Sequence, residues 1–295
     1  MSDEDNSDHR EVSERMAYAA LQLKELSNMD YETPDGSQFS LLPIWQSESG
    51  ESPRFMYTSV SAFVDGNAYT GKIQSFPEDI EDEELLACLQ PVPPECIHPI
   101  FPESFTMAPA YDASKHYLKA PSFIYELAQP GVTKVAESVL NEAKVMELLR
   151  QHPHQNLAQY YGCVVAEGRI KQLCLQRYEC NLTQWMHKHH DQPSQKEAEA
   201  VLDDIEAGIQ HLHSLGFAHN DLNPENICIS RDNRAMLVDF DCCIPLGEVM
   251  PKGESIVFDE ERGVMISDRG NDFEGMDDIA DFLLGASNFG DATNS

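Results

Sequence analysis

The sequence has little of what several classes of protein require. Its 295 residues include only 20 Lys and Arg against 51 Asp and Glu, which gives a formal net charge of −31. Proteins that bind nucleic acids or anionic membrane surfaces neutralise phosphates with clustered basic side chains. We therefore expect neither a nucleic acid nor a membrane as a partner.

Long apolar runs are missing as well. No stretch approaches the roughly 20 apolar residues of a membrane-spanning helix, and the polar N-terminus lacks the apolar core of a signal peptide. This favours a cytoplasmic or nuclear protein. The eight cysteines are too sparse for a disulfide scaffold, and no two of them have the Cys-x-x-Cys spacing of a zinc site. We expect reduced thiols that are mostly packed inside the protein.

The N-terminal third gives weak structural signals. Residues 1–15 are predicted to be a disordered acidic tail, and residues 16–110 are a region of uncertain structure. A short helix is predicted over 16–26, and short strands are predicted around 55–57 and 62–64.

Two further stretches of that region have a distinctive composition. Residues 78–84 contain six acids in seven positions, which indicates a solvated segment. Residues 91–109 contain six prolines, which disfavour both a regular helix and a central strand. We expect a connector with irregular packing here.

Clearer patterns begin at about residue 111, and we predict one domain over 111–295. Its first part, to about 178, combines strands with one helix, whereas the part from 179 is mostly helical with one hairpin. Ser194 and Glu197 form a capping-box pattern at the start of a helix that should end at Gly216. The other predicted elements are strands over 116–123, 163–166, 171–176, 227–229 and 236–238 and a helix over 135–149. This order predicts an α+β fold with two lobes.

A set of acidic and amide side chains flanks the last predicted hairpin. The segment His219–Asn226 precedes the hairpin and contains Asp221, and Asp239-Phe240-Asp241 follows it. Phosphoryl transfer uses such a set, because one carboxylate orients the attacking hydroxyl while another carboxylate and an amide oxygen bind Mg²⁺.

These motifs resemble those of the protein kinase superfamily. His219, Asn220, Asp221, Leu222 and Asn226 match the catalytic loop H-R-D-L-x-x-x-N, and Asp239-Phe240-Asp241 matches D-F-G. Residues 151–157 resemble the "HPNI" segment that follows helix C, and Asn271-Asp272-Phe273 resembles the start of helix F, whose Asp braces the catalytic loop. The sequence of the whole stretch resembles that of a divergent fungal group of kinase-like proteins.

The resemblance implies a role for each matching residue. Asp221 would be the catalytic base, and Asn226 and Asp239 would bind Mg²⁺. Nucleotide contacts would come from Lys119, from its ion-pairing partner Glu142, and from Gln176 and Tyr178 in the hinge between the lobes. ATP and Mg²⁺ are the implied cofactors, and a protein substrate or binding partner is implied beside the nucleotide.

The sequence also departs from the family pattern. No glycine lies between Ser104 and Lys119, so the usual phosphate-covering loop is missing or rebuilt. Asn220 replaces the Arg that normally binds an activation-loop phosphate, which disfavours phosphorylation-driven ordering of that kind. Asn223 replaces a Lys, and Asp241 replaces the glycine of D-F-G. Little sequence follows the region that resembles helix F, so we expect a minimal, truncated large lobe.

Three functions remain open at this point. The retained Asp221, Asn226 and Asp239 favour a protein kinase that phosphorylates Ser or Thr. The departures favour a pseudokinase that acts as a binding module. The forms His-Asn-Asp and Asp-Phe-Asp also resemble loops of small-molecule kinases of the choline-kinase and aminoglycoside-phosphotransferase type, which is the third alternative.

Overall fold

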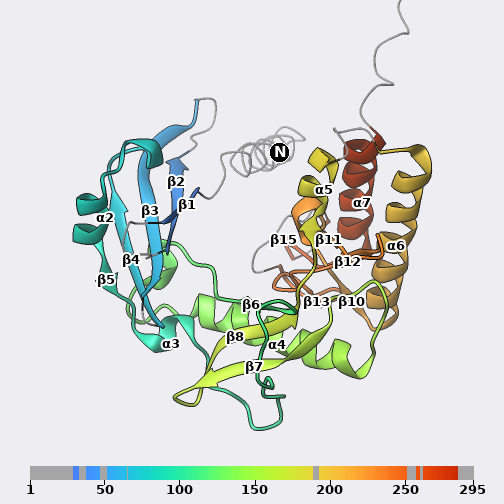
Figure 1. Ribbon diagram of the computed structural model, residues 1–295, viewed down its shortest axis with the longest axis horizontal. Coiled ribbons are helices and arrows are strands. Elements are labelled where there is room, and N and C mark those ends of the chain that lie inside the picture. Colours follow the sequence, from blue (N-terminus) through green and yellow to red (C-terminus); the bar gives the residue numbers. More distant parts are fainter. Residues whose placement is uncertain are drawn as a thin grey trace, which may run out of the picture. The chain divides into compact units, whose positions relative to one another are not determined.

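The computed structural model describes most of the chain in two compact units (Figure 1). The described residues are 29–32, 38–46, 52–64, 66–188, 193–250, 257–259 and 262–284. The first unit comprises residues 1–99 and 121–137, and the second comprises residues 100–120 and 138–295. The helix predicted over 16–26 and the acidic tail lie outside the described residues. The domain boundary expected near residue 110 stays a prediction.

The first unit is built on an antiparallel sheet with the strand order β1-β2-β3-β4-β5. Its strands are β1 (Met29–Glu32), β2 (Gln38–Gln46), β3 (Arg54–Val64), β4 (Asn67–Ile73) and β5 (Gln90–Pro91). The two short strands predicted around 55–57 and 62–64 are both parts of β3. Three small polar residues between them remain in the strand because Thr58 and Ser59 are buried and hydrogen-bonded.

Short helices lie between β4 and β5 and after β5 along the chain. They are η1 (Pro77–Asp79), α2 (Asp82–Cys88), α3 (Pro94–Ile97) and η2 (Tyr125–Ala128). Within the acidic stretch 78–84, α2 forms and buries Leu85 against the sheet core. The expectation that prolines exclude a helix from 91–109 is wrong at α3, where Pro94 occupies the first helical turn and loses no hydrogen bond there.

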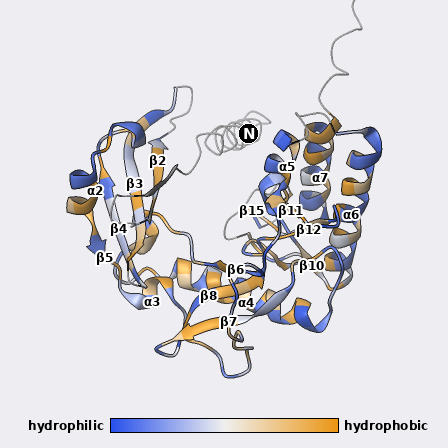
Figure 2. Ribbon diagram, in the orientation of Figure 1, coloured by the Kyte–Doolittle hydropathy of each residue, from blue (hydrophilic) through white to orange (hydrophobic). Residues whose placement is uncertain are grey.

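The second unit begins with a small antiparallel sheet of order β6-β8-β7. Its strands are β6 (His116–Lys119), β7 (Tyr160–Ala166) and β8 (Arg169–Gln176), and the helix α4 (Lys134–Gln151) lies between β6 and β7 in the chain. The strand predicted over 116–123 ends at Lys119, because Pro121 cannot continue the ladder and restricts Ala120 before it. Figure 2 shows β7 and β8 as the hydrophobic strands of this sheet.

The proline-rich connector runs along the outer edge of β7. Ala108 N–H donates to the Cys163 carbonyl over 2.8 Å, and Cys163 N–H donates to Thr106 over 2.7 Å. Gly162 permits this approach, because a Cβ at its position would lie 2.6 Å from the backbone of Met107. The irregular packing expected of this connector is therefore present in its second half.

The rest of the second unit is mostly helical. Its helices are α5 (Leu182–Lys188), α6 (Gln195–Ser214), η3 (Pro224–Asn226) and α7 (Arg269–Leu284). Its short strands are β9 (Cys180–Asn181), β10 (Phe217–Ala218), β11 (Ile227–Ile229), β12 (Ala235–Leu237), β13 (Ile244–Pro245), β14 (Phe258–Asp259) and β15 (Val264–Met265). The predicted capping box is confirmed, because Ser194 and Glu197 exchange both of its hydrogen bonds at the start of α6.

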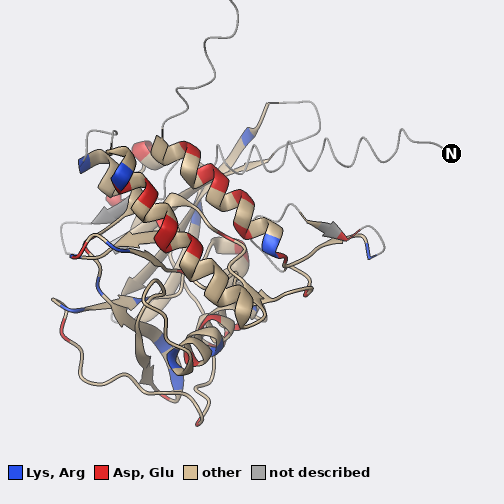
Figure 3. Ribbon diagram, turned by 90° about the vertical axis from the view of Figure 1, so that its right-hand side faces the viewer, with Lys and Arg blue, Asp and Glu red and all other residues tan. Residues whose placement is uncertain are grey.

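Acidic side chains dominate two of the long helices of the second unit. Helix α6 has five acids and one Lys, and α7 has five acids and one Arg. Figure 3 shows these acids along two neighbouring helices. In the described ranges, no helix is both long enough and apolar enough to span a membrane. The predicted α+β class is confirmed by the arrangement of the elements.

Candidate active site

Lys119 connects two of the predicted site residues. Its Nζ lies 2.7 Å from Glu142 Oε1 and 2.6 Å from Asp239 Oδ1. Lys119 is the last residue of β6, Glu142 lies in α4, and Asp239 follows β12. Three distant segments of the second unit therefore meet at one ammonium group.

The charges around Lys119 keep it protonated. Burial lowers its pKa, but the nearby carboxylates of Glu142, Asp239 and Asp241 raise the pKa by more, so the net shift is upward. Glu142 is buried and also accepts a hydrogen bond from Phe240 N–H over 3.3 Å. Through these contacts, Glu142 links α4 to Lys119 and to the segment that follows Asp239.

Asp239 and Asn226 lie at the same end of the β11–β12 hairpin. Val238 N–H donates to the Asn226 carbonyl over 3.0 Å, which brings the residue after Val238 next to Asn226. Asp239 has a φ of 61°, in the left-handed region that non-glycine residues rarely adopt. Strain of this kind persists where the surrounding structure enforces it and is frequent at functional sites.

The loop before the hairpin holds Asp221 against Asn226. The Asn226 side-chain nitrogen donates to the Asp221 carbonyl over 2.8 Å and to its carboxylate over 3.0 Å. Asn223 caps η3 by accepting from the N–H groups of Glu225 and Asn226. The position where the family has a Lys therefore has a structural role in shaping this loop.

The donor set suits a hard cation. Because the nitrogen of Asn226 binds Asp221, its amide oxygen remains as the atom that can ligate a metal. Asp239 uses Oδ1 for Lys119 and can offer its second oxygen. Carboxylate and amide oxygens are the ligands that Mg²⁺ prefers, so Asn226 and Asp239 fit the predicted role.

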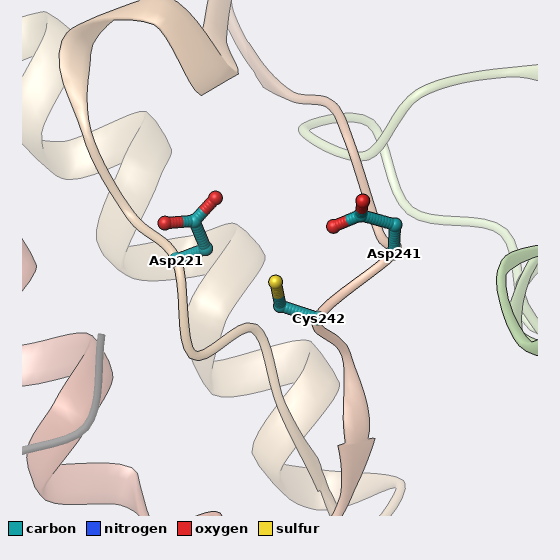
Figure 4. Close-up of side chains that lie close together, drawn as sticks. All are labelled: Asp221, Asp241 and Cys242. Atoms are coloured by element: carbon teal, nitrogen blue, oxygen red, sulfur yellow. The ribbon is translucent and has the colours of Figure 1, made fainter. Parts of the chain in front are cut away.

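A second carboxylate faces Asp221. The ligand atoms of Asp221, Asp241 and Cys242 all lie within 4.8 Å of one another (Figure 4). The sequence indicated an extra carboxylate near the metal site at Asp241. It gave no signal for Cys242, whose thiol lies beside the two carboxylates.

The two predicted hinge residues, Gln176 and Tyr178, line a pocket that does not include the groups described above. This pocket has a volume of about 490 Å³ and is also lined by Leu149, His154 and Met236, among others, and Lys119, Glu142 and Asp239 are not part of its lining. The Tyr178 hydroxyl accepts from Gln159 N–H over 3.2 Å, and burial raises the pKa of Tyr178 to about 12. Their role in nucleotide binding stays a prediction.

A buried carboxylate binds the backbone of the loop that contains Asp221. Asp272 of α7 accepts hydrogen bonds from His219 N–H over 2.9 Å, from Asn220 N–H over 2.7 Å and from the His213 ring over 2.8 Å. This is the bracing contact that the sequence suggested for Asp272.

The edge of the small sheet that ends in Lys119 differs from the family pattern. In the sheet order β6-β8-β7, β6 is an edge strand. The chain segment before β6 packs against β7 at the opposite edge. Within the described part of the second unit, no pair of strands therefore lies beside β6 at the edge of the sheet that β6 forms.

Comparison with known proteins agrees with this geometry. A family model described as the protein kinase domain matches residues 124–257, which is less than half of the chain. The match includes Glu142, Asp221, Asn226 and Asp239, and it starts after Lys119.

Several curated proteins are similar to part of this chain. The chain is 30% identical to the 2-5A-dependent ribonuclease of Mus musculus over 40% of this chain and 17% of that protein. It is 29% identical to receptor-interacting serine/threonine-protein kinase 1 of Homo sapiens, over 37% of this chain and 16% of that protein. It is 34% identical to the serine/threonine-protein kinase/endoribonuclease IRE1 of Hypocrea jecorina (strain QM6a), over 33% of this chain and 8% of that protein. The matches cover less than a fifth of the length of each of these relatives. The matched family model and these relatives show that part of this chain is similar to the protein kinase domain.

Proposed function

We propose that the protein is an ATP- and Mg²⁺-dependent phosphotransferase of the protein kinase type that acts on Ser or Thr hydroxyls. The observation that carries this proposal is the contact of Lys119 with both Glu142 and Asp239. A lysine between two carboxylates from separate segments suits a site in which a positive charge must be held beside bound phosphates.

Each residue of the site has a proposed task. Glu142 orients Lys119, whose ammonium contacts the phosphates of the nucleotide. Asp221 accepts the proton of the attacking hydroxyl, and Asn226 keeps the Asp221 carboxylate in place through its 3.0 Å hydrogen bond. Asn226 and Asp239 hold Mg²⁺, which when bound neutralises the charge that develops on the phosphates.

A thermal-shift titration tests nucleotide binding directly. ATP that binds only the folded protein raises the melting temperature, by about 5 °C at a hundredfold excess over Kd. We expect this rise with Mg²⁺ and a smaller rise without it. No shift at millimolar ATP with Mg²⁺ would contradict the proposal.

Phosphotransfer is then tested with two substitutions of the same type. Asp221→Asn should abolish transfer and leave ATP binding intact, because it removes the base and keeps the shape of the side chain. Asp232→Asn, in the exposed turn of the β11–β12 hairpin, is the matched control and should behave like wild type. Transfer that persists in Asp221→Asn would remove Asp221 from its proposed role.

A pseudokinase is the second candidate, and two observations favour it. Asp241 places a further carboxylate beside Asp221, and β6 is an edge strand without the usual glycine-rich strands beside it in the described part of its unit. ATP binding without transfer to any Ser or Thr substrate would support this candidate. Transfer to a small molecule instead of a protein would support a small-molecule kinase.

The narrower resemblance to a divergent fungal kinase-like group and the cytoplasmic or nuclear location are further proposals. They rest on the sequence alone. Localisation of the tagged full-length chain by fluorescence microscopy would test the second of them.

A further inference from the structure

Asn220 has an unusual position for a polar residue. Its side chain is 1% exposed, and its φ of 61° lies in the left-handed region. Asn is one of the few non-glycine residues that adopt this conformation readily. At the matching position, the protein kinase pattern has a charged Arg.

The amide of Asn220 instead finds its partners inside the fold. Its nitrogen lies 3.0 Å from the Ala218 carbonyl, 3.1 Å from the Cys242 carbonyl and 2.9 Å from Ser267 Oγ. Its oxygen accepts from the Asn271 side chain over 2.9 Å. Both ends of the amide are therefore satisfied by neutral groups.

Two of these contacts reach the segment that follows Asp239-Phe240-Asp241. Asn220 binds the Cys242 carbonyl directly, and Ser267 donates from its hydroxyl to the Ile244 carbonyl over 3.2 Å. Strand β13, which begins at Ile244, also pairs with β10 through Ala218. The loop that contains Asp221 is thus connected to both ends of the segment 242–244.

We propose that Asn220 is a positioning residue whose buried amide holds residues 242–244 against the loop that contains Asp221. This inference rests on the proposed phosphotransfer function and adds what keeps Asp221 and the segment after Asp239 in their relative positions. The hydrogen bonds of the amide connect the two segments directly and through Ser267. Loss of the amide should therefore loosen residues 242–244.

The alternative is that Asn220 only tolerates a left-handed backbone. Asn220→Gly separates the two explanations, because glycine adopts this conformation freely but removes the amide network. Asn233→Gly is the matched control, since Asn233 has a φ of 55° in the exposed turn of the β11–β12 hairpin.

Hydrogen exchange of the full-length protein is the first measurement. Loss of the Asn220 bonds should raise amide exchange in residues 243–246 about tenfold in Asn220→Gly, because each lost bond weakens local closure. Asn233→Gly should leave this segment as protected as wild type. Equal protection in folded Asn220→Gly would overturn the proposal.

Asn220→Asp gives a readout that a purely backbone role would not change. A carboxylate at this position would face the carbonyl oxygens of Ala218 and Cys242, so the protection of 243–246 should be lost at about pH 7.5. Protonation restores one donor, so protection should partly return at about pH 5.5. The other titratable groups near Asn220 are Asp272 and its partner His213, the neighbouring His219 and Asp221, and Cys242 and Cys243. Wild type and Asn220→Gly at both pH values correct for them.

Nucleotide binding separates failure of this inference from failure of the proposed function. If wild type binds ATP with Mg²⁺, Asn220→Gly should bind it about tenfold more weakly. If wild type does not bind ATP, the phosphotransferase proposal fails while the exchange data still test the network. If Asn220→Gly does not fold, Ser267→Ala replaces it, and unchanged exchange at residues 243–246 in that variant would overturn the proposal.

Discussion

Two polar clusters of the second unit are built from different chemistry. The first is the contact of Lys119 with Glu142 and Asp239, in which every group is charged. The second surrounds Asn220 and consists of Ser267, Asn271 and one carboxylate, Asp272.

The clusters also differ in their access to solvent. Lys119 and Asp239 keep 20% and 33% of their side chains exposed. Every member of the Asn220 cluster is buried. Charges that remain in contact with water can exchange partners for a ligand at modest cost, whereas buried neutral bonds are lost only when the fold opens.

The difference separates two tasks that one polar network could not perform together. The charged cluster offers groups that a nucleotide and a cation could recruit. The buried cluster around Asn220 fixes the loop on which Asp221 and the segment after Asp239 depend. The following substitutions test this division, beginning with the largest expected effect.

Asp272→Ala should be the most damaging of these changes. It removes the acceptor of three hydrogen bonds at a fully buried position, so the free energy of unfolding should fall by about 3 kcal/mol or more. Urea denaturation measures the change. Asp277→Ala, on the exposed side of the same helix, is the control, and a similar small loss in both variants would contradict a bracing role for Asp272.

Lys119→Met should destabilise the protein less. It leaves Glu142 buried beside Asp239 without a cation, which should cost about 2 kcal/mol given the remaining exposure of the site. Adding Glu142→Gln should recover part of that loss, because the second substitution removes the uncompensated charge. Additive losses in the double variant would show that the two side chains do not interact.

Local sequence patterns predicted the long elements of the second unit well. The helix predicted over 135–149 and the capping box of α6 depend on neighbours in the chain, so the sequence displays them directly. The five-stranded sheet of the first unit depends on pairing across many residues. Small polar residues in β3 broke the alternation that a strand prediction needs, and only the neighbouring strands explain why Ser59 is buried.

The candidate site was predictable only where a motif fixes residue order. The motifs placed Asp221 and Asn226 together, and the structure shows them hydrogen-bonded. The contact of Lys119 with Asp239 joins residues 120 positions apart. The position of Cys242 beside Asp221 and Asp241 arises only in the folded chain. The same is true of the partners of Asn220, because nothing in the spacing of Ser267 or Asn271 along the sequence relates them to Asn220.

Asp204 provides a reference carboxylate outside both clusters. Burial raises its pKa, but hydrogen bonds from Arg234 and from Ala235 N–H outweigh this and hold the pKa below its usual value. Its contribution should therefore be present above about pH 4 and disappear as the pH falls through the lowered pKa. Because Arg234 is partly exposed, Asp204→Asn should reduce stability at neutral pH by only about 1 kcal/mol.

Urea denaturation between about pH 7 and pH 2.5 checks this expectation. The difference between wild type and Asp204→Asn should shrink towards acid pH. A difference that stays constant over this range would mean that the charge of Asp204 contributes nothing. The hydrogen bonds of Ser267 to Asn220 and to the Ile244 carbonyl involve no charged group, so Ser267→Ala should show such a constant difference.

Ser194→Ala should have the smallest effect. It removes one half of the exposed capping box at the start of α6, which is worth about 1 kcal/mol. Neither polar cluster includes Ser194, so ATP-dependent thermal shifts and exchange in residues 243–246 should match wild type once global stability is taken into account. If this remote and modest loss changed either readout as much as Asn220→Gly does, both clusters would be reporting overall stability, and the division of tasks between them would have to be abandoned.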